Sequence, residues 1–255
     1  MLIPTFVELL RADNPSEMTL DGTNTWALRH GESHYAVVDP GPKGHEAHIM
    51  SLTGGRISAI FLTHRHTDHS ESAPALASLC GATIFAADPI FASNDKSYLS
   101  DGQFFNFDEL TIRAIAVPGH TSDSVAFLAS NQTEIALLTG DTILGEGSSI
   151  ITFPDGDVGD YLDSLDRLEI DVRKQNLKVP LLPGHGGTHS DSLPMISKYR
   201  NHRLARLEEI RSALQQGATD AKGIVDQVYP DVPVALIPAA IMIVEAQLAY
   251  LSERA

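Results

Sequence analysis

Short blocks of apolar and polar residues alternate along the first 190 positions and predict a mixed α/β domain. Apolar runs bounded by turn residues predict seven strands, at Thr25–Arg29, Tyr35–Asp39, Ile57–Leu62, Ala82–Ala86, Leu110–Val117, Val125–Ala129 and Glu134–Leu138. Apolar residues at helical spacing predict helices among them, at Glu46–Leu52, Glu71–Leu79 and Tyr161–Ile170. This mixture predicts an α/β sandwich, in which helices cover the sheets.

After about residue 190 the pattern becomes helical throughout. Apolar residues at helical spacing predict helices at Ser190–Gln216, Ala218–Val228 and Ala235–Ser252. We therefore divide the chain into an α/β body at residues 1–190 and a helical annex at residues 191–255.

The most apolar stretch of the chain, Val232–Tyr250, lies in this annex. Pro233, Pro238, Glu245 and Gln247 interrupt it, so it predicts a packed helix rather than the run of about 18 apolar residues that spans a membrane. The N-terminal segment lacks the basic leader and the long apolar core of a secretory signal. We expect a cytoplasmic protein that does not enter a membrane.

Charge and cysteine content exclude several classes of protein. The chain has 18 Lys and Arg residues against 33 Asp and Glu residues, a formal net charge of −15. Such a surface repels phosphate backbones unless positive charge gathers locally, so generic coating of nucleic acids is excluded. The single cysteine, Cys80, excludes an intramolecular disulfide and a multi-cysteine zinc cage. Eleven histidines are the unusual feature.

Three of these histidines and one aspartate stand within six residues, shortly after a predicted buried strand. Clustered neutral histidines carry lone pairs that need a partner, and a metal ion supplies one. Alternate positions of an extended segment point the same way, so His64 and His66 can bind one ion. Asp68 and His69 follow at the predicted start of the next helix and can bind a second ion.

Three further metal-capable side chains each follow an apolar, strand-like run and stand next to a glycine: His120, Asp141 and His185. Glycine lets the backbone turn closely at such a position. Asp39 also ends a predicted strand, where it either hydrogen-bonds the ligand histidines or forms a turn, and both interpretations stay open.

The motif His-x-His-x-Asp-His at residues 64–69, followed by these three side chains, resembles that of the metallo-β-lactamase fold superfamily of hydrolases. Within it, the chain is most similar to the β-lactamase-like protein 2 group, in the segments Gly22–Trp26, Val38–Gly41, Leu144–Ser149 and Tyr161–Leu165 and in the helical tail. The resemblance covers nearly the whole chain. It implies an αββα sandwich with a winged-helix-like annex at about Ala218–Ala255.

The resemblance also implies the roles of the side chains. One metal ion is held by His64, His66 and His120, a second by Asp68, His69 and His185, and Asp141 bridges the two. Imidazole and carboxylate ligands without thiolate suit Zn²⁺, with Mn²⁺ or Fe²⁺ as alternatives. Two such ions about 3.5–4 Å apart share a hydroxide that acts as the nucleophile. The resemblance implies that Asp68 orients the attacking water and that Asp141 bridges the ions. These two aspartates are therefore the predicted catalytic residues.

Two functions are consistent with this pattern. The first is hydrolysis of a small ester, thioester or similar anionic substrate, which the acidic surface favours because the metal site carries the local positive charge. The second is cleavage of single-stranded RNA, implied by the resemblance to the β-lactamase-like protein 2 group. Its local support is residues 198–211, with five basic and two acidic side chains, although a solvated helix face is the simpler explanation. We expect the annex to pack over the cleft or to form a homodimer contact.

Overall fold

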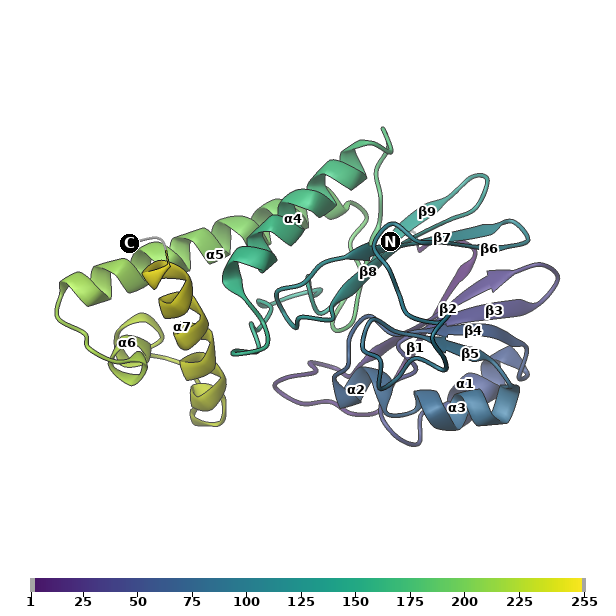
Figure 1. The fold of residues 1–255 in the computed structure, drawn as a ribbon, viewed down its shortest axis with the longest axis horizontal. Helices are drawn as coiled ribbons and strands as arrows, with labels where there is room; N and C mark the ends of the chain where they lie inside the picture. The colour runs from purple at the N-terminus through teal and green to yellow at the C-terminus, as the bar shows by residue number, and fades with distance from the viewer. Residues whose placement is uncertain (1–2, 254–255) are drawn as a thin grey trace.

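The computed structural model describes residues 3–253, and its body contains two five-stranded sheets that lie face to face (Figure 1). The first sheet has the order β1-β2-β3-β4-β5, with strands at Val7–Arg11, Asn24–His30, His34–Val38, Ile57–Phe61 and Thr83–Phe85. Strands β1 to β3 pair antiparallel, and β3 to β5 pair parallel.

The second sheet has the order β10-β9-β8-β7-β6. Its strands, in chain order from β6 to β10, are Phe104–Phe107, Leu110–Ala116, Val125–Ser130, Ile135–Gly140 and Leu181–Pro183. Neighbours from β6 to β9 are antiparallel, whereas β9 and β10 are parallel. The parallel pair brings the residues that follow β9 and β10 to the same end of the sheet.

Alternation along the central strands builds the inner layers. Neighbouring residues of a strand face opposite sides of the sheet. In β4, Phe61 points between the sheets and meets Phe127 of β8, with ring centroids 5.4 Å apart. Ile60 points the other way and packs under the helices α1 (Glu46–Thr53) and α3 (Ala73–Cys80). The first sheet is therefore buried on both faces.

The outer face of the second sheet is covered by α4 (Val158–Arg173) and by the first half of α5 (Ser192–Gln215). Leu137 of β9 belongs to the same buried cluster as Leu165 of α4 and Tyr199 of α5. Helices thus cover both outer faces of the paired sheets (Figure 1). The predicted αββα sandwich is confirmed.

The remaining helices form a separate cluster at the end of the molecule. They are α6 (Ala221–Val228), the short 3-10 helix η1 (Val234–Leu236) and α7 (Ile237–Ser252). α6 and α7 pack on the second half of α5. Figure 1 shows them at the left, beyond the ends of the strands.

The helical character of the predicted annex is confirmed, but its winged-helix likeness is not. Residues 191–253 contain no strand, and the last two residues of the predicted annex lie outside the described part of the chain. α5 belongs to both regions, because Tyr199 packs in the body and Ile210 packs with α6 and α7. The division after residue 190 stays a prediction.

One expectation about the annex needs correction. Within the described residues, Val234–Ser252 is a continuous helical stretch of 19 residues with a mean hydropathy of 1.9, long and apolar enough to cross a membrane by length and composition alone. Only 22% of the most apolar 18-residue part of this stretch is buried inside the protein. The helix is packed at Ala240 and Val244 against α5 and α6 and at Ala246 against the body, but much of its apolar surface stays accessible, whereas a helix that is apolar all round is normally enclosed.

All seven predicted strands form, with ends that differ by at most two residues. The seven predicted strands do not include β1, β6 and β10, which are edge strands, although the strand-like run before His185 corresponds to β10. In β1, Glu8 and Arg11 interrupt the apolar pattern, because an edge strand is partly solvated and tolerates charge.

Candidate metal centre

All seven predicted ligands meet at one end of the paired sheets. Two follow β4, and two lie on the single-turn helix α2 (Thr67–Ser70). The others follow β7, β9 and β10. Their donor atoms form three overlapping groups, in each of which the atoms lie within 4.8 Å of one another: His64–His66–His120, His64–His69–Asp141 and Asp68–His69–His185.

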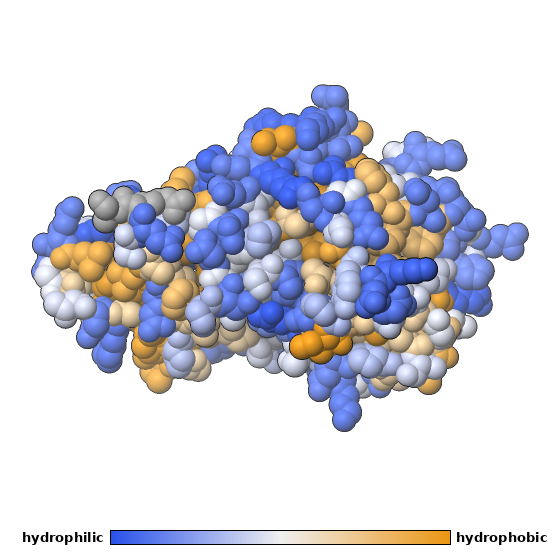
Figure 2. Space-filling model, viewed as in Figure 1, coloured by the Kyte–Doolittle hydropathy of each residue, from blue (hydrophilic) through white to orange (hydrophobic). Residues whose placement is uncertain are grey.

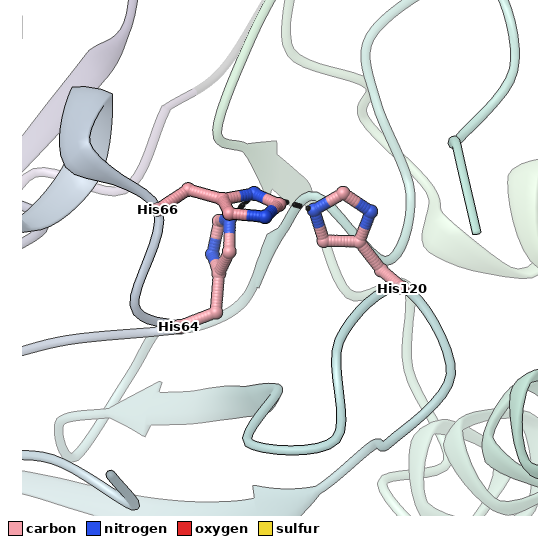
Figure 3. A group of neighbouring side chains, drawn as sticks. All are labelled: His64, His66 and His120. Atoms are coloured by element: carbon pink, nitrogen blue, oxygen red, sulfur yellow. Dashed lines mark hydrogen bonds between the residues drawn. The ribbon is translucent and has the colours of Figure 1, made fainter. Parts of the chain in front are cut away.

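In the first group, three rings converge on one point (Figure 3). The Nε2 atoms of His64 and His120 lie 3.0 and 3.1 Å from Nδ1 of His66. Nitrogens that share one tetrahedral zinc ion lie about 3.3 Å apart, given Zn–N bonds of about 2.05 Å. His120 Nδ1 donates to the carbonyl of Ile150 at 2.5 Å, so its Nε2 presents a lone pair to the group. Spacing and protonation both fit a metal ion.

The group formed by Asp68, His69 and His185 shows the same arrangement. His69 Nδ1 donates to Asp39 Oδ2 at 2.9 Å, and His185 Nδ1 donates to the Gly22 carbonyl at 3.3 Å. Their Nε2 atoms face each other at 3.2 Å, and two facing lone pairs repel unless a cation lies between them. Asp68 Oδ2 completes the group at 3.1 Å from His185 Nε2 and 3.4 Å from His69 Nε2.

Asp141 lies between the two groups. Its Oδ1 is 3.4 Å from His69 Nε2, and its Oδ2 is 3.4 Å from His185 Nε2 and 3.8 Å from His120 Nε2. Oδ1 is buried without a hydrogen-bond partner among residues 3–253, which is costly for a carboxylate unless a cation binds it. Gly184 leaves the space open, because a Cβ atom there would stand 2.5 Å from this oxygen. The residues present fit a metal pair.

Asp39 does not belong to the ligand groups but orients His69 and Thr63, the residue before His64. Its side chain is buried and accepts hydrogen bonds from Thr63 N at 2.8 Å, Thr63 Oγ1 at 2.7 Å and His69 Nδ1 at 2.9 Å. It also ends β3 in the left-handed region, with a φ of +52°. Of the two interpretations that the sequence left open, the hydrogen bond to a ligand histidine is confirmed.

The electrostatics of the centre call for positive charge between the carboxylates. Burial alone would lower the pKa of His69, but the charges of three aspartates, Asp141 foremost, outweigh it and raise the pKa well above its usual range. At His185, burial also lowers the pKa, but the charge of Asp141 outweighs it and the pKa rises to about 9. Burial and neighbouring histidines hold the pKa of His64 well below its usual range. A metal cation between His69 and His185, the two histidines whose pKa is raised, would supply this positive charge in place of protons.

The ligand cluster forms one end of a cavity of about 640 Å³. Five of the predicted ligands line it: His66, Asp68, His120, Asp141 and His185. Most of the other lining side chains are apolar, and they come from residues 18–20, from residues 144–152 and from the C-terminal helices. Among the residues that the structure describes, neither Lys nor Arg lines this cavity. Residues of the annex therefore line the cleft, as the first of the two predicted alternatives has it, and the homodimer contact stays a prediction.

Two polar residues that the sequence did not single out hydrogen-bond the ligands. Thr23 Oγ1 lies 3.4 Å from Asp68 Oδ2, and Ser149 Oγ donates to the backbone carbonyl of Asp141 at 2.5 Å. Both residues belong to segments that carried the family resemblance, and that signal could have found them. The apolar lining residues of α7 gave no such signal, because apolar helix residues are ordinary core residues.

The basic residues that could guide RNA are mostly bound to protein groups. Arg203 is buried and donates to the Ser149 carbonyl at 2.7 Å. Three other arginines of α5 form ion pairs, Arg200 with Asp166, Arg206 with Glu209 and Arg211 with Glu208. This part of α5 therefore presents little unpaired positive charge.

Comparison with known proteins agrees with this geometry. The sequence profile of the metallo-beta-lactamase superfamily matches residues 18–185. The beta-lactamase-like protein 2 homolog of Drosophila melanogaster is 31% identical, over 94% of this chain and 85% of that protein. The atrochrysone carboxyl ACP thioesterase of Aspergillus chevalieri is 29% identical, over 91% of this chain and 75% of that protein. This chain spans about two thirds of the lactamase-like protein aptB of Emericella nidulans, which is 31% identical over 82% of this chain.

Solved structures show the same fold. A metallo-beta-lactamase family protein from Thermus thermophilus superposes with a TM-score of 0.77 and 22% identity, over 98% of this chain and 94% of that chain. Because the superfamily profile covers more than half of the chain, and relatives above 30% identity cover most of it, the chain belongs to the metallo-beta-lactamase superfamily, whose members are metal-dependent hydrolases.

Proposed function

We propose that this protein is a dinuclear metal-dependent hydrolase that cleaves an ester or a thioester. The observation that carries the proposal is the position of the ligand cluster, at one end of a largely apolar cavity that no Lys or Arg of the described chain lines. An apolar wall suits an acyl group, and the metal end suits the polar bond that is cleaved. A cytoplasmic location is part of the same proposal.

In this proposal, one ion would be held by His64, His66 and His120 and the other by Asp68, His69 and His185. The ligand groups and the position of Asp141 between them support this assignment. Imidazole and carboxylate donors favour Zn²⁺, and Mn²⁺ and Fe²⁺ are the alternatives. When bound, such a pair of ions supplies a hydroxide nucleophile near neutral pH and polarises the carbonyl group.

The side chain of Asp68 is placed to hydrogen-bond the attacking water. It is 27% exposed, lines the cavity and lies beside the hydroxyl of Thr23. Burial opposes ionisation, but the neighbouring His69 holds the pKa of Asp68 far below its usual range, so the carboxylate accepts hydrogen bonds from water at neutral pH. Asp68 therefore orients the attacking water by accepting a hydrogen bond from it.

The thioester is supported by a relative, since the Aspergillus chevalieri protein is named as an acyl carrier protein thioesterase. Single-stranded RNA is less well supported, because no Lys or Arg in residues 3–253 lines the cavity and the arginines of α5 are bound to protein groups. A strand of RNA needs positive charge along its backbone.

The test is hydrolysis by protein loaded with Zn²⁺ or Mn²⁺, with an acyl thioester, a p-nitrophenyl ester and single-stranded RNA as substrates at low and high salt. We expect thioester or ester cleavage that changes little with salt, because few phosphate contacts form. Asp68→Asn should lower activity at least about tenfold, because the amide has one oxygen fewer to bind metal and to accept a hydrogen bond from water. Asp21→Asn is the matched control, since Asp21 is exposed and pairs only with Arg11 among the described residues. Cleavage of RNA alone, with a steep loss at high salt, would show that the proposed substrate is wrong.

A further inference from the structure

The helix α7 carries an apolar face that the protein core does not bury. Leu236, at its start, and Met242 and Ile243 within it are half-buried and belong to none of the buried hydrophobic clusters in the described part of the chain. Val244, the next residue along the helix, is fully buried against α5 and α6. Figure 2 shows hydrophobic atoms reaching the surface in the region of the C-terminal helices, at the left of the view. An apolar face of this kind needs an occupant.

The uncovered face of α7 is one wall of the cavity that ends at the ligand cluster. Leu236, Ala239 and Ile243 stand at positions i, i+3 and i+7, which lie on one side of a helix, and all three line the cavity. Met18 and Leu20 contribute apolar surface from the N-terminal part of the chain. The cavity therefore joins an apolar region to the side chains that hold metal.

We propose that this region binds the extended apolar acyl chain of the substrate, with α7 as the wall that selects for chain length. The inference rests on the proposed function, because it assigns the acyl part of the ester or thioester to a defined part of the same cavity.

The dimensions suit a chain of medium length. Leu236 and Ile243 are separated by seven helical positions, which corresponds to about 10 Å along the axis of α7. An extended acyl chain of about eight carbons covers this distance, and the volume of the cavity, about 640 Å³, lies in the usual range for sites that enclose small molecules. Each buried methylene should strengthen binding by up to about fourfold.

The shape of the region favours an acyl chain over a membrane or a second copy of the protein. The apolar side chains of α7 face into a concavity shared with His66, Asp68 and His120, which a flat bilayer surface does not enter. Two exposed acidic residues, Glu17 and Glu146, also line this cavity and would repel an anionic lipid surface. An acyl chain reaches the apolar wall while its carboxyl carbon stays at the metal end.

The experiment measures kcat/KM of the metal-loaded protein for thioesters from acetyl to dodecanoyl, together with calorimetric binding of dodecanoate, which needs no turnover. We expect kcat/KM to rise about two- to fourfold per methylene up to about eight carbons and then to level off. Ile243→Asp should lower octanoyl turnover at least tenfold, with a loss that shrinks as the chain shortens, and should weaken dodecanoate binding equally. Ala239→Phe, which fills the cavity, should move the plateau to shorter chains.

Val234→Asp is the matched control, because Val234 is 82% exposed and does not line the cavity. It should behave as the unmodified protein. Thioester cleavage that is independent of chain length would overturn the acyl site and leave the proposed function intact. Chain-length-dependent binding of dodecanoate that Ile243→Asp removes, without hydrolysis of any ester, would support the site and reject the function. If turnover and binding show no chain-length dependence, two other outcomes would overturn the acyl site. Binding of the protein to vesicles that Ile243→Asp removes would assign the face to a membrane. A dimer that Ile243→Asp dissociates would assign the face to a second copy of the protein.

Discussion

Replacing Asp39 by Asn tests whether the centre depends on a residue that does not bind metal itself. The carboxylate accepts three hydrogen bonds, two from Thr63 and one from His69 Nδ1. An amide has one oxygen and one NH₂ group, so it cannot accept at both positions. The substitution should not strain the backbone, because Asn tolerates the left-handed conformation that Asp39 adopts.

Either orientation of the amide is costly. If its oxygen faces Thr63 N, its NH₂ group faces His69 Nδ1 and forces the proton of that ring onto Nε2, the atom that faces His185. If its oxygen faces His69 instead, its NH₂ group opposes the Thr63 backbone N–H in a buried site, at about 1–3 kcal/mol. Loss of such an orienting partner typically lowers metal affinity about 10–100-fold, which is about 1.4–2.7 kcal/mol.

The assay is the dissociation constant for Zn²⁺, measured by competition with a chromogenic chelator, together with the melting temperature of metal-free protein. Asp108→Asn is the control, since Asp108 pairs with His30 Nδ1 at 3.0 Å, also has a positive φ and lies outside the centre. We expect the control to bind metal normally. If Asp39→Asn also binds zinc within about twofold of the unmodified protein, the role assigned to Asp39 is wrong.

Three further changes probe the same structure. Asp141→Ala should lose both bound metal and turnover, because this carboxylate lies between the two ligand groups; elemental analysis showing full metal content would contradict that position. Gly184→Ala should weaken metal binding because its Cβ would stand 2.5 Å from Asp141 Oδ1, whereas Gly187→Ala, with open space around its Cβ position, should not; equal affinities in the two variants would exclude the steric argument. At Asp171, burial opposes ionisation, but Lys174 and Arg113 lower its pKa. Its ionised form therefore stabilises the fold above the ordinary carboxyl pKa of about 4, and this contribution is lost as the pH falls through the lowered value. Asp171→Asn should cost about 2 kcal/mol at neutral pH and progressively less in acid, as measured by urea unfolding, and a cost independent of pH would refute the assignment.

Several elements could be read from local patterns, and others could not. The strand at Ile57–Phe61 is apolar at every position but the exposed Ser58, because its other residues are buried on both faces, so its pattern is plain in the sequence. The edge strand β1 was missed because it carries charge where it meets water. The basic stretch of α5 suggested an RNA guide, but charge counted along a sequence does not show which residues pair across helices, as Arg200 does with Asp166.

The sequence by itself determined the fold class and predicted seven candidate ligand side chains. It could do so because strand alternation is a local property of the backbone, and because the order of the histidines and aspartates resembles that of a known superfamily. Only the tertiary structure decided which ligands share a point in space, that Asp39 holds His69, and that α7 turns an apolar face towards the centre. Those relations join residues that are 30 to more than 100 positions apart, and no local periodicity records such contacts.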